Sequence, residues 1–203
     1  VDYLLVTHAH TDHIGRIGKL TKEGFTGQIL STPETKDLSA LLLEDAVKLL
    51  DHEARNKGIL PLYEAKDVAQ AFSLWQTVPY HTKKELKNGI SIYLKDAGHV
   101  LGSSMIELSY NGKKIVFTGD LGNSPSLLLK DTEDITDANY IVMESVYGDR
   151  NHAPKEERKK KLKKVIEDTI KYKRTLIIPA FSLERTQMMI YEMNEIFESG
   201  EIK

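Results

Sequence analysis

The sequence contains no cysteine, and this absence excludes disulfide bonds, thiolate metal sites and cysteine nucleophiles. Any metal ion must therefore be held by histidine and carboxylate side chains. The sequence also has no run of roughly 20 apolar residues, the length that spans a bilayer, so we expect a soluble protein with no membrane partner. The lack of cysteine fits an intracellular protein, and we expect a cytoplasmic location.

Composition and length are those of an ordinary globular protein. Hydrophobic residues make up 40% of the 203 residues and charged residues 29%, which excludes a disordered tail, a collagen-like repeat and a coiled-coil rod. The net charge of -2 gives the chain no overall attraction to nucleic acid. Residues 155–174 differ, because ten Lys and Arg outnumber four Asp and Glu there. A phosphate-contacting surface and a solvated helix face both remain open as interpretations of this segment.

Hydrophobic patterns and turn residues predict a mixed α/β order of elements. Thr32 and Pro33 suit a helix N-cap and first helical residue, and Gly58 suits a helix stop. Asn111-Gly112 predicts a type I′ hairpin turn, since both positions require positive φ. Strands are predicted at residues 3–6, 28–31, 90–95, 104–110, 113–118, 140–144 and 175–179, those at 3–6 and 140–144 being buried. Helices are predicted at residues 33–56, 64–76, 155–172 and 183–197.

Four metal-ligand side chains fall within six residues directly after the first predicted strand: His8, His10, Asp12 and His13. In an extended loop His8 and His10 lie on the same side, while Asp12 and His13 face a neighbouring volume. Six residues can therefore serve two adjacent metal ions. These ligand types suit Zn²⁺, with Mn²⁺ or Fe²⁺ as alternatives. A solvated polar loop with a salt-bridged aspartate is the structural alternative.

Two further candidates follow later strands. His99 lies between glycines after the strand predicted at 90–95, and Asp120 follows Gly119 after the strand predicted at 113–118. Each alone is typical of a structural turn. Their joint presence with the first cluster favours a shared metal site.

The cluster at residues 8–13, followed by His99 and then by Thr118-Gly119-Asp120, resembles the metallo-β-lactamase superfamily. Residues 143–150 resemble the first motif of its nucleic-acid-processing β-CASP branch, and residues 179–187 are similar to the strand-to-helix segment of the inserted β-CASP domain. The resemblance covers essentially the whole chain. It implies an α/β fold, with an αββα metallo-β-lactamase sandwich over residues 1–150 and the start of the β-CASP α/β domain over residues 151–203.

The resemblance also implies two zinc ions, with Mn²⁺ as an alternative, and six ligands: His8, His10, Asp12, His13, His99 and Asp120. His8, His10 and His99 would bind one ion. Asp12 and His13 would bind the other, and Asp120 would bridge both. Asp12, Asp120 and Glu144 are the expected catalytic residues, Glu144 being the acid that supports an active-site histidine in the family. Two such ions, about 3.5 to 4 Å apart, hold a bridging hydroxide and clamp phosphate oxygens.

The chain departs from the family pattern at both ends. It begins at Val1, inside a predicted strand, whereas the family has further strands and an acidic motif upstream. Two later family histidines, one a general acid and one a ligand of the second zinc, have no match after Gln187. We therefore expect a fragment truncated at both ends, inactive or metal-poor by itself.

The resemblance implies a zinc-dependent ribonuclease, endonucleolytic or exonucleolytic, that acts alone, as a homodimer or in an RNA-processing complex. Ser182 and Arg185 lie where a strand is predicted to turn into a helix, a geometry that favours phosphate binding. A helix cap or a salt bridge is the alternative for this pair. Three other functions stay open: a small-molecule hydrolase of the lactonase or thioesterase kind, a DNA nuclease, and a catalytically silent RNA-binding scaffold.

Overall fold

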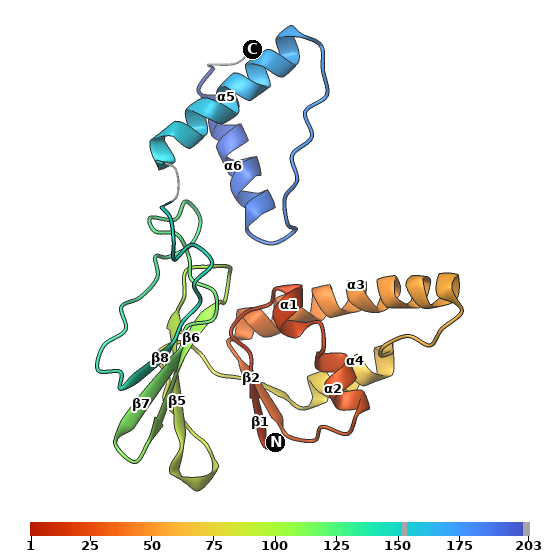
Figure 1. Ribbon diagram of the computed structural model, residues 1–203, viewed down its shortest axis with the longest axis vertical. Coiled ribbons are helices and arrows are strands. Elements are labelled where there is room, and N and C mark those ends of the chain that lie inside the picture. The colour runs from red at the N-terminus through yellow and green to blue at the C-terminus, as the bar shows by residue number, and fades with distance from the viewer. Residues whose placement is uncertain (152–153, 201–203) are drawn as a thin grey trace. The chain divides into compact units, whose positions relative to one another are not determined.

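The computed structural model describes residues 1–151 and 154–200, and the chain divides into two compact units, Val1–Glu144 and Ser145–Lys203. The division falls six residues before the boundary expected from the sequence. Sheets and helices alternate in the first unit, so the predicted α/β class is confirmed (Figure 1). Among the described residues, no helix is both long enough and apolar enough to cross a bilayer.

The first unit contains a small parallel sheet of three strands in the order β1-β2-β3. Its strands are β1 (Tyr3–Leu5), β2 (Gln28–Ser31) and β3 (Trp75–Thr77). The helices between them are α1 (Thr11–Ile14), α2 (Ile17–Lys22), α3 (Pro33–Lys57) and α4 (Ala65–Ser73). Val6, Ile29 and Trp75 from the sheet side pack with Ile14 and Leu43 from the helices in one buried cluster. The helices therefore cover one face of this sheet (Figure 1).

A second sheet has five strands in the order β4-β5-β6-β7-β8, all antiparallel except the last pair. They are β4 (Lys84–Glu85), β5 (Ser91–Asp96), β6 (Ser104–Tyr110), β7 (Lys113–Phe117) and β8 (Tyr140–Val142), with the 3-10 turn η1 (Lys87–Gly89) before β5. Asn111 and Gly112 join β6 to β7 with positive φ of 48° and 72°, as the hairpin prediction requires.

The two sheets pack face to face. Leu30 of β2 lies in a buried cluster with Ile92, Leu94 and Ile106 of the second sheet. Val116, on the opposite face, packs in another cluster together with the loop that follows β7. Helix, sheet, sheet and loop therefore form successive layers, and the strand ends of both sheets can meet.

Helix α3 begins and ends as its sequence predicts. The Thr32 hydroxyl accepts a hydrogen bond from the Thr35 N–H, and Pro33 occupies the first turn. Gly58 closes the helix in the left-handed conformation, with φ of 63°. The Thr32 hydroxyl also donates to the Gly102 carbonyl at 2.6 Å, which ties this helix to the segment that carries His99.

Three local predictions were wrong. The helix expected at 64–76 ends at Ser73, because Trp75 instead pairs with Ile29 in the sheet and donates its indole N–H to Ser31. Residues 140–142 form the expected strand, but their side chains are exposed, since β8 is an edge strand that pairs with β7 alone among the described strands. Residues 175–179 form no strand, because no described strand lies beside them to pair with.

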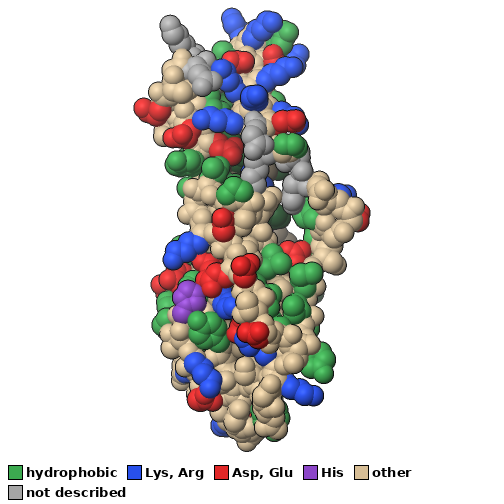
Figure 2. Space-filling model, turned by 90° about the vertical axis from the view of Figure 1, so that its left-hand side faces the viewer, with side chains coloured by type: hydrophobic (Ala, Val, Ile, Leu, Met, Phe, Trp, Pro, Cys, Tyr) green, Lys and Arg blue, Asp and Glu red, His purple; other side chains and the backbone are tan. Residues whose placement is uncertain are grey.

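The second unit contains α5 (Lys155–Lys171) and α6 (Arg185–Glu198). They pack through Ile166 and Ile196, which are buried, with Leu162, Leu176 and Met193 partly buried around them. Figure 2 shows many Lys and Arg side chains on this unit, in line with the basic composition of residues 155–174.

Candidate metal centre

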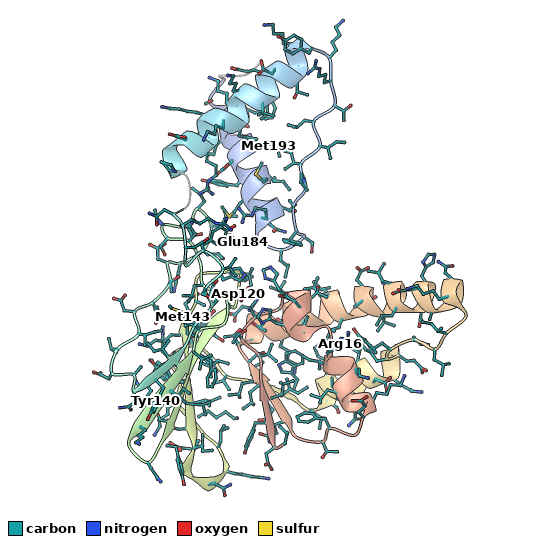
Figure 3. All side chains as sticks on the ribbon, viewed as in Figure 1. Arg16, Asp120, Tyr140, Met143, Glu184 and Met193 are labelled. Atoms are coloured by element: carbon teal, nitrogen blue, oxygen red, sulfur yellow. The ribbon has the colours of Figure 1, made fainter. Side chains whose placement is uncertain are left out.

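The predicted metal ligands come from three loops that follow strands. His8 and His10 follow β1, His99 lies between β5 and β6, and Asp120 follows β7 (Figure 3). The expectation of an extended loop through residue 13 was wrong, since Thr11–Ile14 form the single turn α1, for which His10 is the N-cap residue. The turn bonds the His13 and Ile14 N–H groups to the His10 carbonyl. It thereby brings Asp12 and His13 beside His8 and His10.

Four donor atoms from these loops converge within 4.8 Å of one another: those of His8, His10, His99 and Asp120. His10 Nδ1 lies 3.1 Å from His8 Nε2 and 3.0 Å from His99 Nε2. Asp120 Oδ2 lies 3.8 Å from His8 Nε2 and 3.6 Å from His99 Nε2. A tetrahedral zinc ion with bonds of about 2.0 to 2.2 Å separates its ligand atoms by roughly 3.3 Å. Three imidazole nitrogens and a carboxylate oxygen at this spacing fit such an ion.

The remaining predicted ligands lie on the other side of Asp120. His13 Nε2 is 3.5 Å from Asp120 Oδ1 and 3.4 Å from Asp12 Oδ2. The two carboxylate oxygens of Asp120 therefore face different groups of donors. This arrangement fits an Asp120 carboxylate shared between two cations. The Asp12 side chain is more exposed than that of His13.

The histidines of the cluster are held in their neutral form. Burial, together with the neighbouring His13, His99 and His10, lowers the pKa of His8 to about 2. Burial also lowers the pKa of His10 and of His99, although Asp120 opposes the shift at both. A neutral imidazole offers its nitrogen lone pair to a metal ion without first losing a proton.

Small polar groups hold the ligands in place. Thr7 Oγ1 lies 3.1 Å from His8 Nδ1, and the Thr7 carbonyl accepts from the Ser104 N–H. Ser103 Oγ accepts from the backbone N–H groups of His99 and Val100 at 3.0 and 3.2 Å. Thr7 and Ser103 were not predicted from the sequence as supporting residues. Their only signal is adjacency to a ligand or to its loop.

Glu144 lies beside the same loop as Asp120. Its Oε1 accepts from the Leu121 N–H at 3.0 Å, and its own N–H donates to Thr118 Oγ1 at 3.3 Å. The carboxylate thus fixes the backbone directly after Asp120, and its charge opposes the lowering of the His99 pKa that burial causes. Its predicted role as an acid that supports an active-site histidine stays a prediction.

Ser182 and Arg185 belong to the second unit. Arg185 is the first residue of α6, and the Ser182 carbonyl accepts from the Gln187 side-chain amide at 2.9 Å. Between them Glu184 has a φ of 62°, and burial raises the pKa of its carboxyl. Phosphate binding at this turn stays a prediction.

Several known proteins are similar to this chain in sequence. The family described as "Metallo-beta-lactamase superfamily" matches residues 1–180. Ribonuclease TTHA0252 of Thermus thermophilus is 34% identical over 94% of this chain and 42% of its own length. Transcription termination factor FttA of Pyrococcus horikoshii is 34% identical over 100% of the chain and 32% of its own length. Endoribonuclease YSH1 of Kluyveromyces lactis is 29% identical over 98% of the chain and 27% of its own length. The chain thus spans less than half the length of these relatives.

Proposed function

The chain belongs to the metallo-beta-lactamase superfamily, and from this premise we propose that it is the metal-binding part of a zinc-dependent ribonuclease of the β-CASP type. The observation that carries the proposal is the convergence of His8, His10, His99 and Asp120 from three separate loops. An imidazole-rich set at tetrahedral spacing favours Zn²⁺, with Mn²⁺ as the alternative.

Each ligand has a separate task in the proposed centre. His8, His10 and His99 bind one ion through neutral nitrogens, and burial keeps them neutral at physiological pH. One Asp120 oxygen faces His8 and the other faces His13, so Asp120 would be shared between this ion and a second ion that His13 and Asp12 would hold. Two bound divalent ions would lower the pKa of water and polarise a phosphoryl oxygen. Glu144 positions Asp120 by holding the Leu121 N–H.

RNA is the substrate class that the relatives favour. Two of the three relatives described above carry the names ribonuclease and endoribonuclease, and the third is a transcription termination factor. The basic helix α5 supports the same substrate, since Lys160, Lys161 and Lys164 are exposed and can approach phosphates. Ser182 and Arg185 are also proposed to contact phosphate, because they lie at the N-terminus of α6, where backbone N–H groups favour anions.

The test uses the full-length gene product with Zn²⁺ and with Mn²⁺. Its substrates are labelled single-stranded RNA, labelled single-stranded DNA and a labelled lactone or thioester, and cleavage of each is measured. We expect RNA cleavage that chelation abolishes and that Zn²⁺ restores. His10→Ala should lower the rate more than about 100-fold, because loss of a direct ligand exceeds the effect of an outer-shell change. His52→Ala, an exposed histidine on α3, is the matched control and should leave the rate unchanged. RNA cleavage that survives His10→Ala, or activity confined to DNA or to the small esters, would contradict the proposal.

A further inference from the structure

The loop that begins directly after Asp120 forms hydrogen bonds with the segment directly before His99. We propose that Thr132 and Glu133, in the second half of this loop, are positioning residues that hold His99 for metal binding. The inference rests on the proposed metal centre. Neither residue is among the predicted ligands, and both lie more than ten residues from Asp120 along the chain.

Glu133 forms hydrogen bonds with both the backbone carbonyl and the backbone N–H of Asp96, the last residue of β5. The Glu133 N–H donates to the Asp96 carbonyl at 3.1 Å, and the Asp96 N–H donates to Glu133 Oε1 at 3.2 Å. His81 Nε2 lies 2.8 and 3.0 Å from the two Glu133 carboxylate oxygens and fixes their direction. The loop therefore continues the hydrogen bonding of the sheet to within three residues of His99.

Thr132 holds the next residue, Ala97. Its hydroxyl donates to the Ala97 carbonyl at 2.9 Å, and the Gly122 N–H donates to the same carbonyl at 2.8 Å. Gly122 is two residues from Asp120. The Ala97 carbonyl thus accepts hydrogen bonds from two parts of the loop, and the contact with Gly122 links the segment of Asp120 to the segment of His99.

Gly98 shows how closely the loop approaches the turn. It has a φ of +64°, and an added Cβ would lie 2.8 Å from the Thr132 nitrogen and 3.0 Å from the Lys130 carbonyl oxygen. On the far side of His99, Ser103 Oγ accepts hydrogen bonds from the backbone N–H groups of His99 itself and of Val100. His99 is therefore fixed from the side of residues 96–98 by the loop and from the side of residue 100 by Ser103.

Positioning matters here because the cluster joins imidazoles from different loops. His99 Nε2 must stay near His10 Nδ1 and Asp120 Oδ2, at the 3.0 and 3.6 Å seen in the structure. Removing an outer-shell partner of a metal ligand costs about 10- to 100-fold in metal affinity. A purely structural role would instead lower the stability of the metal-free chain without a specific loss of affinity.

The experiment measures Zn²⁺ affinity by competition with a chromophoric chelator, in the chain carrying Asp12→Ala. This background keeps all four donors of the cluster and removes a ligand of the second ion. Thr132→Val, which keeps the shape but loses the hydroxyl, should weaken Zn²⁺ binding about 10- to 100-fold. Thr132→Ser keeps the donor and should restore the affinity. Thr82→Val, an exposed threonine in the loop before β4, is the matched control and should change nothing.

Glu133 supplies a second, independent pair of variants. Glu133→Ala should weaken Zn²⁺ binding, whereas Glu133→Gln retains an oxygen that accepts from the Asp96 N–H and should stay near the parent. The visible spectrum of bound Co²⁺ should change in Thr132→Val and Glu133→Ala, because the ligand geometry changes, and not in the controls.

Unchanged Zn²⁺ affinity in Thr132→Val and Glu133→Ala would overturn this inference and leave the proposed function standing. The inference would also fail if Thr132→Ser bound as weakly as Thr132→Val, or if the loss of affinity merely followed the thermal midpoint of the metal-free chain. A parent chain that binds no Zn²⁺ would overturn both the inference and the proposed metal centre.

Discussion

Asp120 connects the two groups of predicted metal ligands, because its two carboxylate oxygens face different histidines. Oδ2 lies near His8 and His99, and Oδ1 lies near His13. The loop geometry supports this position: Gly119 has a φ of +56°, and an added Cβ would lie 2.7 Å from the Thr7 side chain. The aspartate can therefore reach between the histidines only because its neighbour has no side chain.

A substitution at Asp120 tests this shared position. Asp120→Asn removes the negative charge that a ligand between two cations supplies. It should therefore lower the number of zinc ions bound per chain and weaken the affinity for the remaining zinc by more than about tenfold. Equilibrium dialysis followed by metal analysis measures both effects. Asp45→Asn, an exposed aspartate on α3, is the control and should bind zinc like the parent. Equal zinc binding by the two variants would contradict the shared role.

At the residue scale, the ligands could be predicted from sequence because their chemistry and spacing are unusual. The cluster from His8 to His13 combines four ligand types in six residues, and His99 and Asp120 each follow a strand. The supporting residues could not be predicted in the same way. Ser103 contacts the backbone of its own turn, whereas Thr132 and Glu133 contact the backbone of a segment distant in sequence. Nothing in the local sequence of these three residues distinguishes them from surface residues.

At the scale of elements, α3 is tied to the site through its first turn. Thr32 Oγ1 accepts from the Thr35 N–H, and the hydroxyls of Thr32 and Thr35 both donate to the Gly102 carbonyl. Both threonines are fully buried. Helix capping and the fixation of the loop after His99 therefore depend on the same side chains.

Thr32→Ala should destabilise the first unit by about 1 to 2 kcal/mol, because it removes the cap of α3 and a buried donor to Gly102. Thr32→Ser keeps both hydrogen bonds and should recover most of the loss. Urea denaturation measures the free energy of unfolding of each variant. A serine variant as unstable as the alanine variant would show that the hydroxyl contributes little.

The second sheet carries a buried ion cluster on the face that the loop covers. Glu107 is buried in β6, with Lys95 Nζ at 3.3 Å from one carboxylate oxygen and Lys114 Nζ at 3.0 Å from the other. The same ammonium groups donate to the carbonyls of Asp134 and Thr136. The three charged residues therefore fasten the loop after Asp120 to the sheet.

Glu107→Leu should destabilise the first unit by about 2 kcal/mol or more, because it leaves two partly buried lysines without their counter-ion. Adding Lys95→Met to this variant should return part of the loss, because one uncompensated charge is then removed. Thermal and urea unfolding of the single and double variants measure the difference. A double variant that is less stable than Glu107→Leu would contradict this account of the ion cluster.

Element boundaries followed the sequence where local signals act alone and departed from it where tertiary contacts decide. Helix α3 has its cap, proline and glycine stop as predicted. Trp75 has the pattern of a helix end but lies in a strand, because its ring packs in the core against Phe72. The edge position of β8 depends on which strands lie beside it, and a single sequence does not specify that.

At the scale of the whole molecule, the division into two units separates the metal ligands from the basic helix α5. All six predicted ligands lie in Val1–Glu144, whereas residues 155–174, with Ser182 and Arg185, lie in Ser145–Lys203. Metal binding should therefore stabilise the first unit through its own residues. Electrostatic attraction to RNA should come from the second.

Substitution of lysines on α5 tests this separation. Lys160→Gln combined with Lys164→Gln should reduce the slope of log affinity for single-stranded RNA against log salt concentration by about 1 to 2, if each lysine neutralises one phosphate. Zn²⁺ affinity should stay unchanged. Fluorescence anisotropy over a range of salt concentrations measures the slope. An unaltered slope would assign α5 a solvated face with no phosphate contact.

The central claim is that three loops of one chain hold a divalent metal ion between His8, His10, His99 and Asp120. The most direct test is metal analysis of the purified chain after dialysis against Zn²⁺, together with the His10→Ala variant and the His52→Ala control. The account predicts at least about one tightly held zinc ion per chain for the parent and the control, and its loss in His10→Ala. Zinc binding that is absent from the parent, or equal in all three proteins, would contradict it.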